Sequence, residues 1–401
     1  MTKKRSLAEW LTLLERRHPS EIDLGLERIA QVADRLQLNS PAAKVITIAG
    51  TNGKGSCVTV LERLLCDAGI AVGAYSSPHL LHYNERIRIN GSDSSDESIC
   101  RAFEQIERAR GDTSLTYFEF GTLAALLIMR DARVDVAILE VGLGGRLDAV
   151  NIVDADVAIV TSIALDHQDW LGSDLNVIAG EKAAIARAEK PLIYGGDQML
   201  PAITDTAKNT GARLLHLKQD FYFDLPTPLV LPEASVQCAL QALSFVAPEV
   251  SKSLDLLRLK DITLRGRFQK VLVDDVMVIL DVAHNPAAAS RLAFKLKEIE
   301  AKGHLRAVAG IMADKDMAGI VAPLNELVDD WFPVEIPGQS RAADRKEWQG
   351  ILCNTRVHES VEAGFETALS RSEAGDTLLV FGSFFTVAPV LKLLDQKGVV
   401  V

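Results

Sequence analysis

Residues 44–56 read KVITIAGTNGKGS, and this stretch decides the fold of the first half of the chain. Val45 to Ala49 is a short, apolar and β-branched run, as expected for a buried parallel strand. The glycines that follow let backbone amides turn inward around phosphate oxygens, and Lys54 can reach the β- and γ-phosphates of a nucleotide. Val58 to Ala68 then predicts a helix, whose N-terminus adds partial positive charge. We therefore predict a strand, a phosphate-binding loop and a helix.

The loop departs from the G-x-x-x-x-G-K-[ST] pattern at two positions. Ile48 stands where the first glycine would be, and Gly55 separates Lys54 from Ser56. A glycine-rich turn without a ligand is the alternative, but the flanking strand and helix favour nucleotide binding. Cys57 lies at the helix start, where a thiol pKa could fall. We expect it to be a small packing residue.

Similar apolar runs recur on both sides of this stretch and alternate with helical patterns. Such alternation predicts a parallel sheet covered by helices on both faces. The further predicted strands are Ala71–Tyr75, Val136–Val141, Val157–Thr161 and Leu192–Tyr194, and two amphipathic helices, Leu7–Arg17 and Leu24–Leu36, precede them.

A second α/β pattern begins after Leu264-Arg265-Gly266-Arg267-Phe268. It opens with a hairpin-like pair that turns at Asp274-Asp275 and continues with strand–helix units. These are Lys270–Val273 with Val276–Asp281, Leu305–Ile311 with Met317–Leu327, Trp331–Ile336 with the stretch around Trp348, and Thr377–Phe381 with Thr386–Leu394. We predict an α/β protein: a P-loop-containing parallel-sheet ATPase domain, residues 1–268, followed by a smaller Rossmann-like domain, residues 269–401.

Composition limits the classes of function. The chain has 401 residues, 48% of them apolar, and a net charge of −11, which is typical of a soluble globular protein and argues against a general nucleic-acid binder. Its longest apolar run, Leu123 to Met129, is far shorter than the roughly 20 residues of a membrane-spanning helix. The N-terminal stretch lacks the apolar run of a signal peptide, and the five cysteines form no C-x-x-C pair. We expect a cytoplasmic protein that binds no membrane.

Polar residues follow three further predicted strands. Ser76-Ser77-Pro78-His79 follows Tyr75, Glu140 and residues 142–148 follow Leu139, and Asp166-His167 follows Ser162 to Leu165. A Ser-Pro turn, a capped loop and a helix cap would each explain one of them. Because parallel strands end at one edge of a sheet, we expect these loops to meet beside the phosphate loop. A hydroxyl, a carboxylate and a neutral histidine could bind Mg²⁺ there, with nucleotide phosphates and water.

Six motifs occur in the order found in folylpolyglutamate synthases of the Mur ligase superfamily. The chain resembles these enzymes over nearly its whole length, most closely the bacterial bifunctional dihydrofolate synthase/folylpolyglutamate synthases. The motifs are Gly50–Ser56, Ser76–His79, Glu140–Asp148, Asp166–His167, Leu264–Phe268 and Asp281–Pro286. The resemblance implies a Mur ligase-like fold, ATP and Mg²⁺ as cofactors, and dihydropteroate, reduced folates and L-glutamate as substrates. We also expect a monomer, because one chain supplies each catalytic part.

The resemblance further implies roles for individual residues. Lys182 matches a lysine that is carbamylated in such enzymes, although the sequence alone would suggest an exposed helical lysine. His284 matches a residue linked to the incoming glutamate, and Ser235 stands where relatives usually carry an Asn that touches the nucleotide. The remaining matches are Thr51, Asn52, Gly53, Lys54, Gly55 and Ser56 in the phosphate loop, Arg267 and Asp281 at ATP, Ser77, Glu140 and His167 at magnesium, and Thr116, Phe118, Leu147, Asp148 and Ala149 at the pterin substrate.

The reaction that the resemblance implies is ATP-dependent amide ligation. A substrate carboxylate attacks the γ-phosphate to give an acyl phosphate, and the amine of L-glutamate displaces phosphate. The alternatives are a monofunctional folylpolyglutamate synthase, a Mur-type peptidoglycan ligase, and a nucleotide-binding regulatory module without ligase chemistry. The regulatory module would have no need of Glu140, His167 and Lys182 beside the loop.

Overall fold

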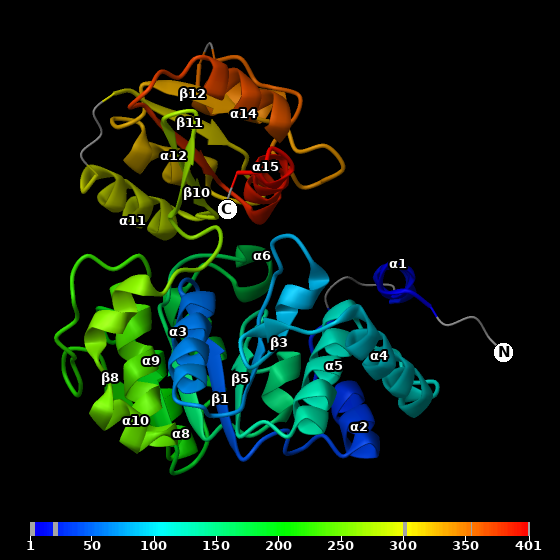
Figure 1. The fold of residues 1–401 in the computed structure, drawn as a ribbon. Coiled ribbons are helices and arrows are strands. Elements are labelled where there is room, and N and C mark those ends of the chain that lie inside the picture. Colours follow the sequence, from blue (N-terminus) through cyan, green and yellow to red (C-terminus); the bar gives the residue numbers. More distant parts are fainter. Residues whose placement is uncertain (1–4, 19–22, 300–302, 354, 400–401) are drawn as a thin grey trace. The chain divides into compact units, whose positions relative to one another are not determined.

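The computed structural model describes residues 5–18, 23–299, 303–353 and 355–399, and it divides into two compact units, residues 1–262 and 263–401 (Figure 1). The division precedes the predicted boundary at Phe268. Two hydrogen bonds explain the difference, because the amide of Phe268 donates to the side-chain Oδ2 of Asp281 (2.8 Å) and the amide of Val282 donates to the carbonyl of Gly266 (2.9 Å). The segment around Gly266 is therefore anchored in the second unit.

The first unit is built on an eight-stranded sheet in the order β4-β3-β2-β5-β1-β6-β7-β8. The strands are β1 (Lys44–Ala49), β2 (Val72–Tyr75), β3 (Ile87–Ile89), β4 (Ser92–Asp93), β5 (Val136–Glu140), β6 (Val157–Val160), β7 (Pro191–Tyr194) and β8 (Arg213–His216). The five predicted strands of this half are present and parallel. The parallel β8 and the antiparallel pair β3–β4 at the opposite edge were not predicted. Strands β3 and β4, with three and two residues, are too short for a clear hydrophobic pattern, and β8 begins and ends with a polar residue, Arg213 and His216.

Helices cover this sheet. Helix α3 (Lys54–Asp67) packs on β1, β2 and β5 and against α9 (Glu233–Val246), while α5 (Tyr117–Ala132) packs on β2 and α7 (Leu175–Ala183) on β6. The other helices are α1 (Leu7–Arg17), α2 (Glu27–Leu36), α4 (Asp96–Arg110), α6 (Gln168–Leu171), α8 (Pro201–Thr210) and α10 (Pro248–Ser253). Helix α1 has its predicted bounds, whereas α2 begins only after its N-cap, Leu26.

The second unit has a five-stranded sheet in the order β12-β11-β13-β10-β9. Its elements are β9 (Gln269–Val273), β10 (Val276–Asp281), α11 (Pro286–Lys297), β11 (Leu305–Ala309), α12 (Met317–Val321), β12 (Asp330–Pro333), α13 (Arg345–Ile351), α14 (Val361–Ser370), β13 (Thr377–Phe381) and α15 (Phe384–Gln396). The predicted β9–β10 hairpin is confirmed, and both residues of its turn have positive φ, 47° and 62°. The helix predicted over Met317–Leu327 is instead α12 and a 3₁₀ turn, because Pro323 cannot donate the next helical hydrogen bond.

Each unit has its own hydrophobic core. Trp10, Phe103 and Phe120 belong to that of the first unit, and Trp348 and Phe381 to that of the second. Among the described residues, no helix has the length and apolarity to cross a membrane.

Candidate nucleotide and substrate site

Four neighbouring strands create the site of the first unit. Strands β2, β5, β1 and β6 lie side by side and run parallel, so their carboxyl ends share one edge of the sheet. The loops that follow them are residues 76–79, 140–148, 50–56 and 162–167. The structure therefore brings together the segments that the sequence singled out, at the edge where open parallel sheets bind ligands.

Two glycines of the phosphate loop have conformations and surroundings that exclude a side chain. Gly50 has φ +141° and Gly53 has φ +86°. A Cβ atom at Gly50 would lie 2.0 Å from Thr161 Oγ1, and one at Gly53 would lie 2.3 Å from Ser235 Oγ. Ser235, on α9, thus packs directly against the loop. The two glycines allow the side chains of Thr161 and Ser235 to approach the loop more closely than a side chain at either position would permit.

The phosphate loop is fixed to the end of β6. The amide of Thr51 donates to the carbonyl of Ser162 (2.8 Å), and the amide of Asn52 donates to Ser162 Oγ (3.1 Å). Thr161 Oγ1 donates to the carbonyl of Asn52 (2.7 Å). Thr161 and Ser162 were not among the predicted site residues; their only signal was a pair of hydroxyl residues at the end of a predicted strand.

The N-terminus of α3 and its first side chains are suited to phosphate. The N-cap, Gly53, has no side chain that could satisfy the first amides of the helix. Ser56 is 1% exposed, and within the described part of the chain its Oγ has no hydrogen-bond partner. Lys54 Nζ donates to the carbonyls of Gly50 (3.0 Å) and Thr51 (3.4 Å), which holds the ammonium over the loop. The oxygens of a phosphate group could accept hydrogen bonds from these amides, from the Ser56 hydroxyl and from the Lys54 ammonium.

Cys57, the next residue, is a packing residue, as expected. It is fully buried on α3, and burial raises the pKa of its thiol well above the ordinary value, with smaller contributions from Cys238 and Glu140. The helix N-terminus does not make it reactive.

The predicted magnesium ligands lie on three loops of this edge. The amide of Ser77 donates to Glu140 Oε2 (3.4 Å), which places these two residues together, and Glu140 is 5% exposed at the end of β5. His167 is the exposed N-cap of α6, after the β6 loop. No three His, Cys, Asp or Glu side chains of the described residues gather as a metal cage. The hydroxyl of Ser77 and the carboxylate of Glu140 are oxygen donors, the kind of ligand that Mg²⁺ prefers.

Lys182 is buried, contrary to what its sequence context alone suggests. It is 5% exposed in the last turn of α7. Its pKa is lowered to about 7, mainly by burial and further by the ammonium of Lys54, while Asp166 and Asp148 oppose the change. Near neutral pH a large share of Lys182 therefore carries a free amine, which is a nucleophile.

The loop from Gly142 to Asp148 is shaped by the carboxylate of Asp148. Asp148 Oδ2 accepts the amides of Gly142 (3.0 Å) and Leu143 (2.8 Å), and Oδ1 accepts the amide of Val150 (3.1 Å). Burial raises the pKa of Asp148, the three hydrogen bonds lower it, and the resulting pKa is about 6. The half-buried Leu147 precedes Asp148, and the buried Ala149 begins a 3₁₀ turn, η2 (Ala149–Ile152).

The first turn of α5 faces this loop. A Cβ atom at Gly142 would lie 2.6 Å from the ring of Phe118, so the aromatic ring packs on the loop backbone. Thr116 is the N-cap of α5 and is 3% exposed. The structure thus gathers four of the predicted pterin residues, Thr116, Phe118, Asp148 and Ala149, around two adjoining loops.

The three predicted residues of the second unit lie at the end of β10. Asp281 accepts the amides of Phe268 and Ala283, each at 2.8 Å, and desolvation raises its pKa while Arg267 lowers it. His284 Nδ1 is 2.8 Å from the carbonyl of Val282. Arg267 stacks over Phe384, 5.3 Å from the ring centroid.

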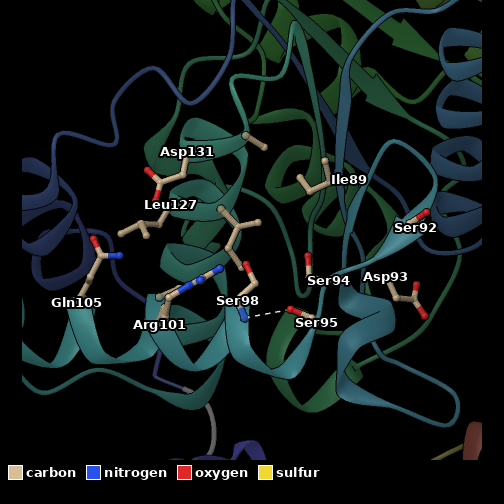
Figure 2. A pocket seen from close by; sticks show the side chains of 13 residues that line it. Ile89, Ser92, Asp93, Ser94, Ser95, Ser98, Arg101, Gln105, Leu127 and Asp131 are labelled. Carbon is tan, nitrogen blue, oxygen red and sulfur yellow. Dashed lines mark hydrogen bonds between the residues drawn. The ribbon is translucent and has the colours of Figure 1, made fainter.

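A cavity of about 390 Å³ lies elsewhere in the first unit, beside the β3–β4 hairpin, α4 and the C-terminal end of α5 (Figure 2). Two of its charged lining residues are already paired, Arg101 with Glu97 and Asp131 with Arg130. Since Thr116 precedes the other end of α5, this cavity is separate from the candidate site.

Comparisons with known proteins agree with this geometry. The Mur ligase middle domain matches residues 48–220, and the Mur ligase glutamate ligase domain matches residues 266–384. The dihydrofolate synthase/folylpolyglutamate synthase of Escherichia coli is 46% identical, over 98% of this chain and 96% of its own. This chain belongs to the dihydrofolate synthase/folylpolyglutamate synthase family. The predicted family, fold class and ligase class are thereby confirmed.

Solved structures of family members have the same fold. That of the E. coli protein in complex with DHPP and ADP has a TM-score of 0.92 and 44% identity, and covers 98% of this chain and 99% of that chain. A bifunctional folylpolyglutamate synthase/dihydrofolate synthase with Mn, AMPPNP and L-glutamate bound has a TM-score of 0.90 and 44% identity, over 98% of this chain and 100% of that one.

Proposed function

We propose that the chain catalyses the ATP-dependent ligation of L-glutamate to dihydropteroate, giving dihydrofolate, and to reduced folates, giving folylpolyglutamates. It works as a monomer in the cytoplasm. One observation carries the proposal: the phosphate loop, the buried Lys182 and the Asp148 loop meet at one sheet edge. In the phosphate loop the buried Ser56 hydroxyl has no hydrogen-bond partner among the described residues. Relatives whose names state both activities, and their complexes with DHPP, nucleotides and L-glutamate, support it.

The phosphate loop binds the nucleotide in this proposal. The amides of residues 53–56 and the Ser56 hydroxyl bind phosphate oxygens, and Lys54 leaves the loop carbonyls to neutralise charge on the γ-phosphate. Ser77, Glu140 and His167 hold Mg²⁺, which supplies further positive charge at the transferring group. Ser235 orders the loop through Gly53. Arg267 and Asp281 also bind ATP.

Lys182 supplies an anionic group near the metal. Its neutral amine attacks CO₂ to form a carbamate, and the amine proton is released to solvent. The carbamate replaces a buried cation by a carboxylate-like ligand, which removes the repulsion from Lys54 that lowers the pKa of Lys182. We therefore assign Lys182 a carbamylated state in the active enzyme.

The pterin substrate lies against the first turn of α5 and the Asp148 loop. Thr116, Phe118, Leu147 and Ala149 line this surface, and Asp148 fixes its shape through three backbone amides. His284 of the second unit orients the incoming glutamate.

A substrate assay tests the proposal. Purified protein with ATP, Mg²⁺ and L-glutamate should release phosphate with dihydropteroate and, separately, with tetrahydrofolate. If only tetrahydrofolate is extended, and dihydropteroate neither reacts nor competes, the enzyme is monofunctional. If neither compound supports glutamate-dependent phosphate release, the proposal is wrong.

Heavy-oxygen labelling tests the route. A carboxylate oxygen that attacks the γ-phosphoryl group must leave with the phosphate. Substrate labelled in its reacting carboxyl should give labelled inorganic phosphate, one label per amide formed. Label in AMP, with pyrophosphate as the other product, would show adenylation instead.

A further inference from the structure

An arginine far from the motifs holds the N-terminus of α5. Glu119 and Thr116 form a capping box, in which Glu119 Oε2 accepts the amide of Thr116 (2.7 Å) and Thr116 Oγ1 accepts the amide of Glu119 (3.2 Å). Arg28, on α2, donates through Nε to both carboxylate oxygens of Glu119, at 2.9 and 3.0 Å. The ion pair joins residues 91 positions apart.

The burial of this pair makes it unusual for a helix cap. The side chain of Glu119 is 4% exposed and that of Arg28 is 23% exposed. Arg28 is itself fixed, because Nη1 donates to Asp23 Oδ2 (2.6 Å) and Nη2 donates to the carbonyl of Asp23. Without Arg28, the carboxylate of Glu119 would be buried without its guanidinium partner. The free-energy cost of an unpaired buried charge would favour rotation of the Glu119 side chain toward solvent, which breaks its hydrogen bond to the amide of Thr116.

Helix α2 supports both parts of the proposed pterin surface. It packs against α5 and against the 3₁₀ turn η2, which begins at Ala149. The first turn of α5 carries Phe118, whose ring packs on Gly142 of the Asp148 loop. A shift of the α5 N-terminus therefore moves the Phe118 ring and the loop that faces it.

We infer that Arg28 is a positioning residue for the pterin-bearing substrate: through Glu119 it fixes the capped first turn of α5 that forms one wall of that site. Arg28 touches no reacting atom. This inference rests on the proposed function, because it takes dihydropteroate as the compound bound at this wall. It predicts an effect on pterin binding that the ATP and glutamate sites do not share.

The test is the KM for each substrate of purified Arg28→Ala. We expect the KM for dihydropteroate to rise roughly tenfold or more, as a buried charged hydrogen bond is lost, with the KM for ATP and for glutamate within about twofold of wild type. Arg28→Lys should recover part of the loss, because an ammonium can still donate to Glu119. Arg17→Ala is the matched control: Arg17, on α1, is 20% exposed and pairs with Glu107 on α4, not with the capping box of α5. It should leave all three KM values unchanged.

Each outcome decides the matter. A wild-type KM for dihydropteroate in Arg28→Ala, or an equal rise for all three substrates, overturns the inference. If Arg28→Ala does not fold, Arg28→Lys and Glu119→Gln take its place, and wild-type KM values in both overturn it. Combining Arg28→Ala with Glu119→Gln should raise the KM no further than the larger single effect. The proposed function fails separately, if the wild-type protein itself does not turn over dihydropteroate.

Discussion

Lys54 is expected to contribute to turnover and little to folding, since within the described part of the chain its half-buried ammonium donates to two carbonyls of its own loop. Lys54→Ala should therefore unfold at the wild-type temperature while kcat falls by about 10²–10³. Phosphate release and thermal unfolding, measured on the same preparation, check this. Lys190→Ala, which removes an exposed lysine paired with Asp156, is the control and should remain fully active. Wild-type turnover by folded Lys54→Ala would disprove the role of this loop.

Gly53 is a second residue whose role can be isolated. In Gly53→Ala, the alanine would have to adopt a left-handed φ of +86°, and its Cβ atom would lie 2.3 Å from Ser235 Oγ. Gly69→Ala has a similar φ, +76°, but its Cβ atom would meet nothing within 4 Å. Both should lower the free energy of unfolding by about 1–2 kcal/mol, from backbone strain. Only Gly53→Ala should also weaken ADP binding, by at least about tenfold in a calorimetric titration, and Ser235→Ala should partly restore it. Equal ADP affinity in the two variants would contradict this account.

Lys182 gives a prediction about pH. Its pKa is about 7 in the folded protein and 10.5 ordinarily, so between these values the unfolded state holds a proton that the folded state has lost. Stability should rise with pH across this window and be lost as pH falls through 7, with a limiting slope of about 1.4 kcal/mol per pH unit from this group. Urea unfolding in CO₂-free buffer at pH 6 to 9 should show this slope in wild type and not in Lys182→Met. Parallel curves would rule out a depressed lysine pKa.

The same residue gives a direct test of carbamylation. After equilibration with ¹³C-bicarbonate, the wild-type protein should show a carbamate carbon by NMR that Lys182→Met lacks. Its absence, together with full activity of Lys182→Met, would remove the proposed carbamate.

At the scale of the element, the loop from Gly142 to Asp148 depends on one carboxylate that accepts three backbone amides. Asp148→Asn has a single side-chain acceptor oxygen, so at least one buried amide should lose its partner, at about 1–3 kcal/mol of stability. The KM for dihydropteroate should rise as the loop loosens. Asp174→Asn is the control, because Asp174 caps α7 with one oxygen and Asn caps as well. Urea unfolding and initial rates measure both effects, and equal stability of the two variants would contradict the assignment.

At the scale of the whole molecule, the second unit should fold by itself. Residues 263–401 hold a complete five-stranded sheet and their own core around Trp348 and Phe381. A fragment of these residues should show cooperative unfolding and dispersed NMR amide signals, since domains with separate cores fold independently. A disordered fragment would show that the second unit needs the first.

The sequence by itself determined the features that are local. A strand, a glycine loop and a helix follow from the spacing of apolar residues and glycines in residues 44–68, and the β9–β10 hairpin follows from two alternating runs around Asp274-Asp275. Because the strands were predicted to be parallel, the sequence also predicted which loops share an edge of the sheet. The six ordered motifs predicted the family for the same reason, since each motif is a short local pattern.

Only the tertiary structure decided burial and partnership between distant segments. Lys182 looks like a surface lysine in its own helix, and its low pKa arises from burial and, next, from the ammonium of Lys54, far away in sequence. Thr116 and Glu119 fit a helix cap, but the arginine that holds Glu119 comes from α2, 91 residues earlier. Strands β3, β4 and β8 are assigned by hydrogen bonds to neighbouring strands and not by their own few residues. Local sequence carries periodicity and turn chemistry, whereas exposure, charge coupling and pairing exist only once the chain has folded on itself.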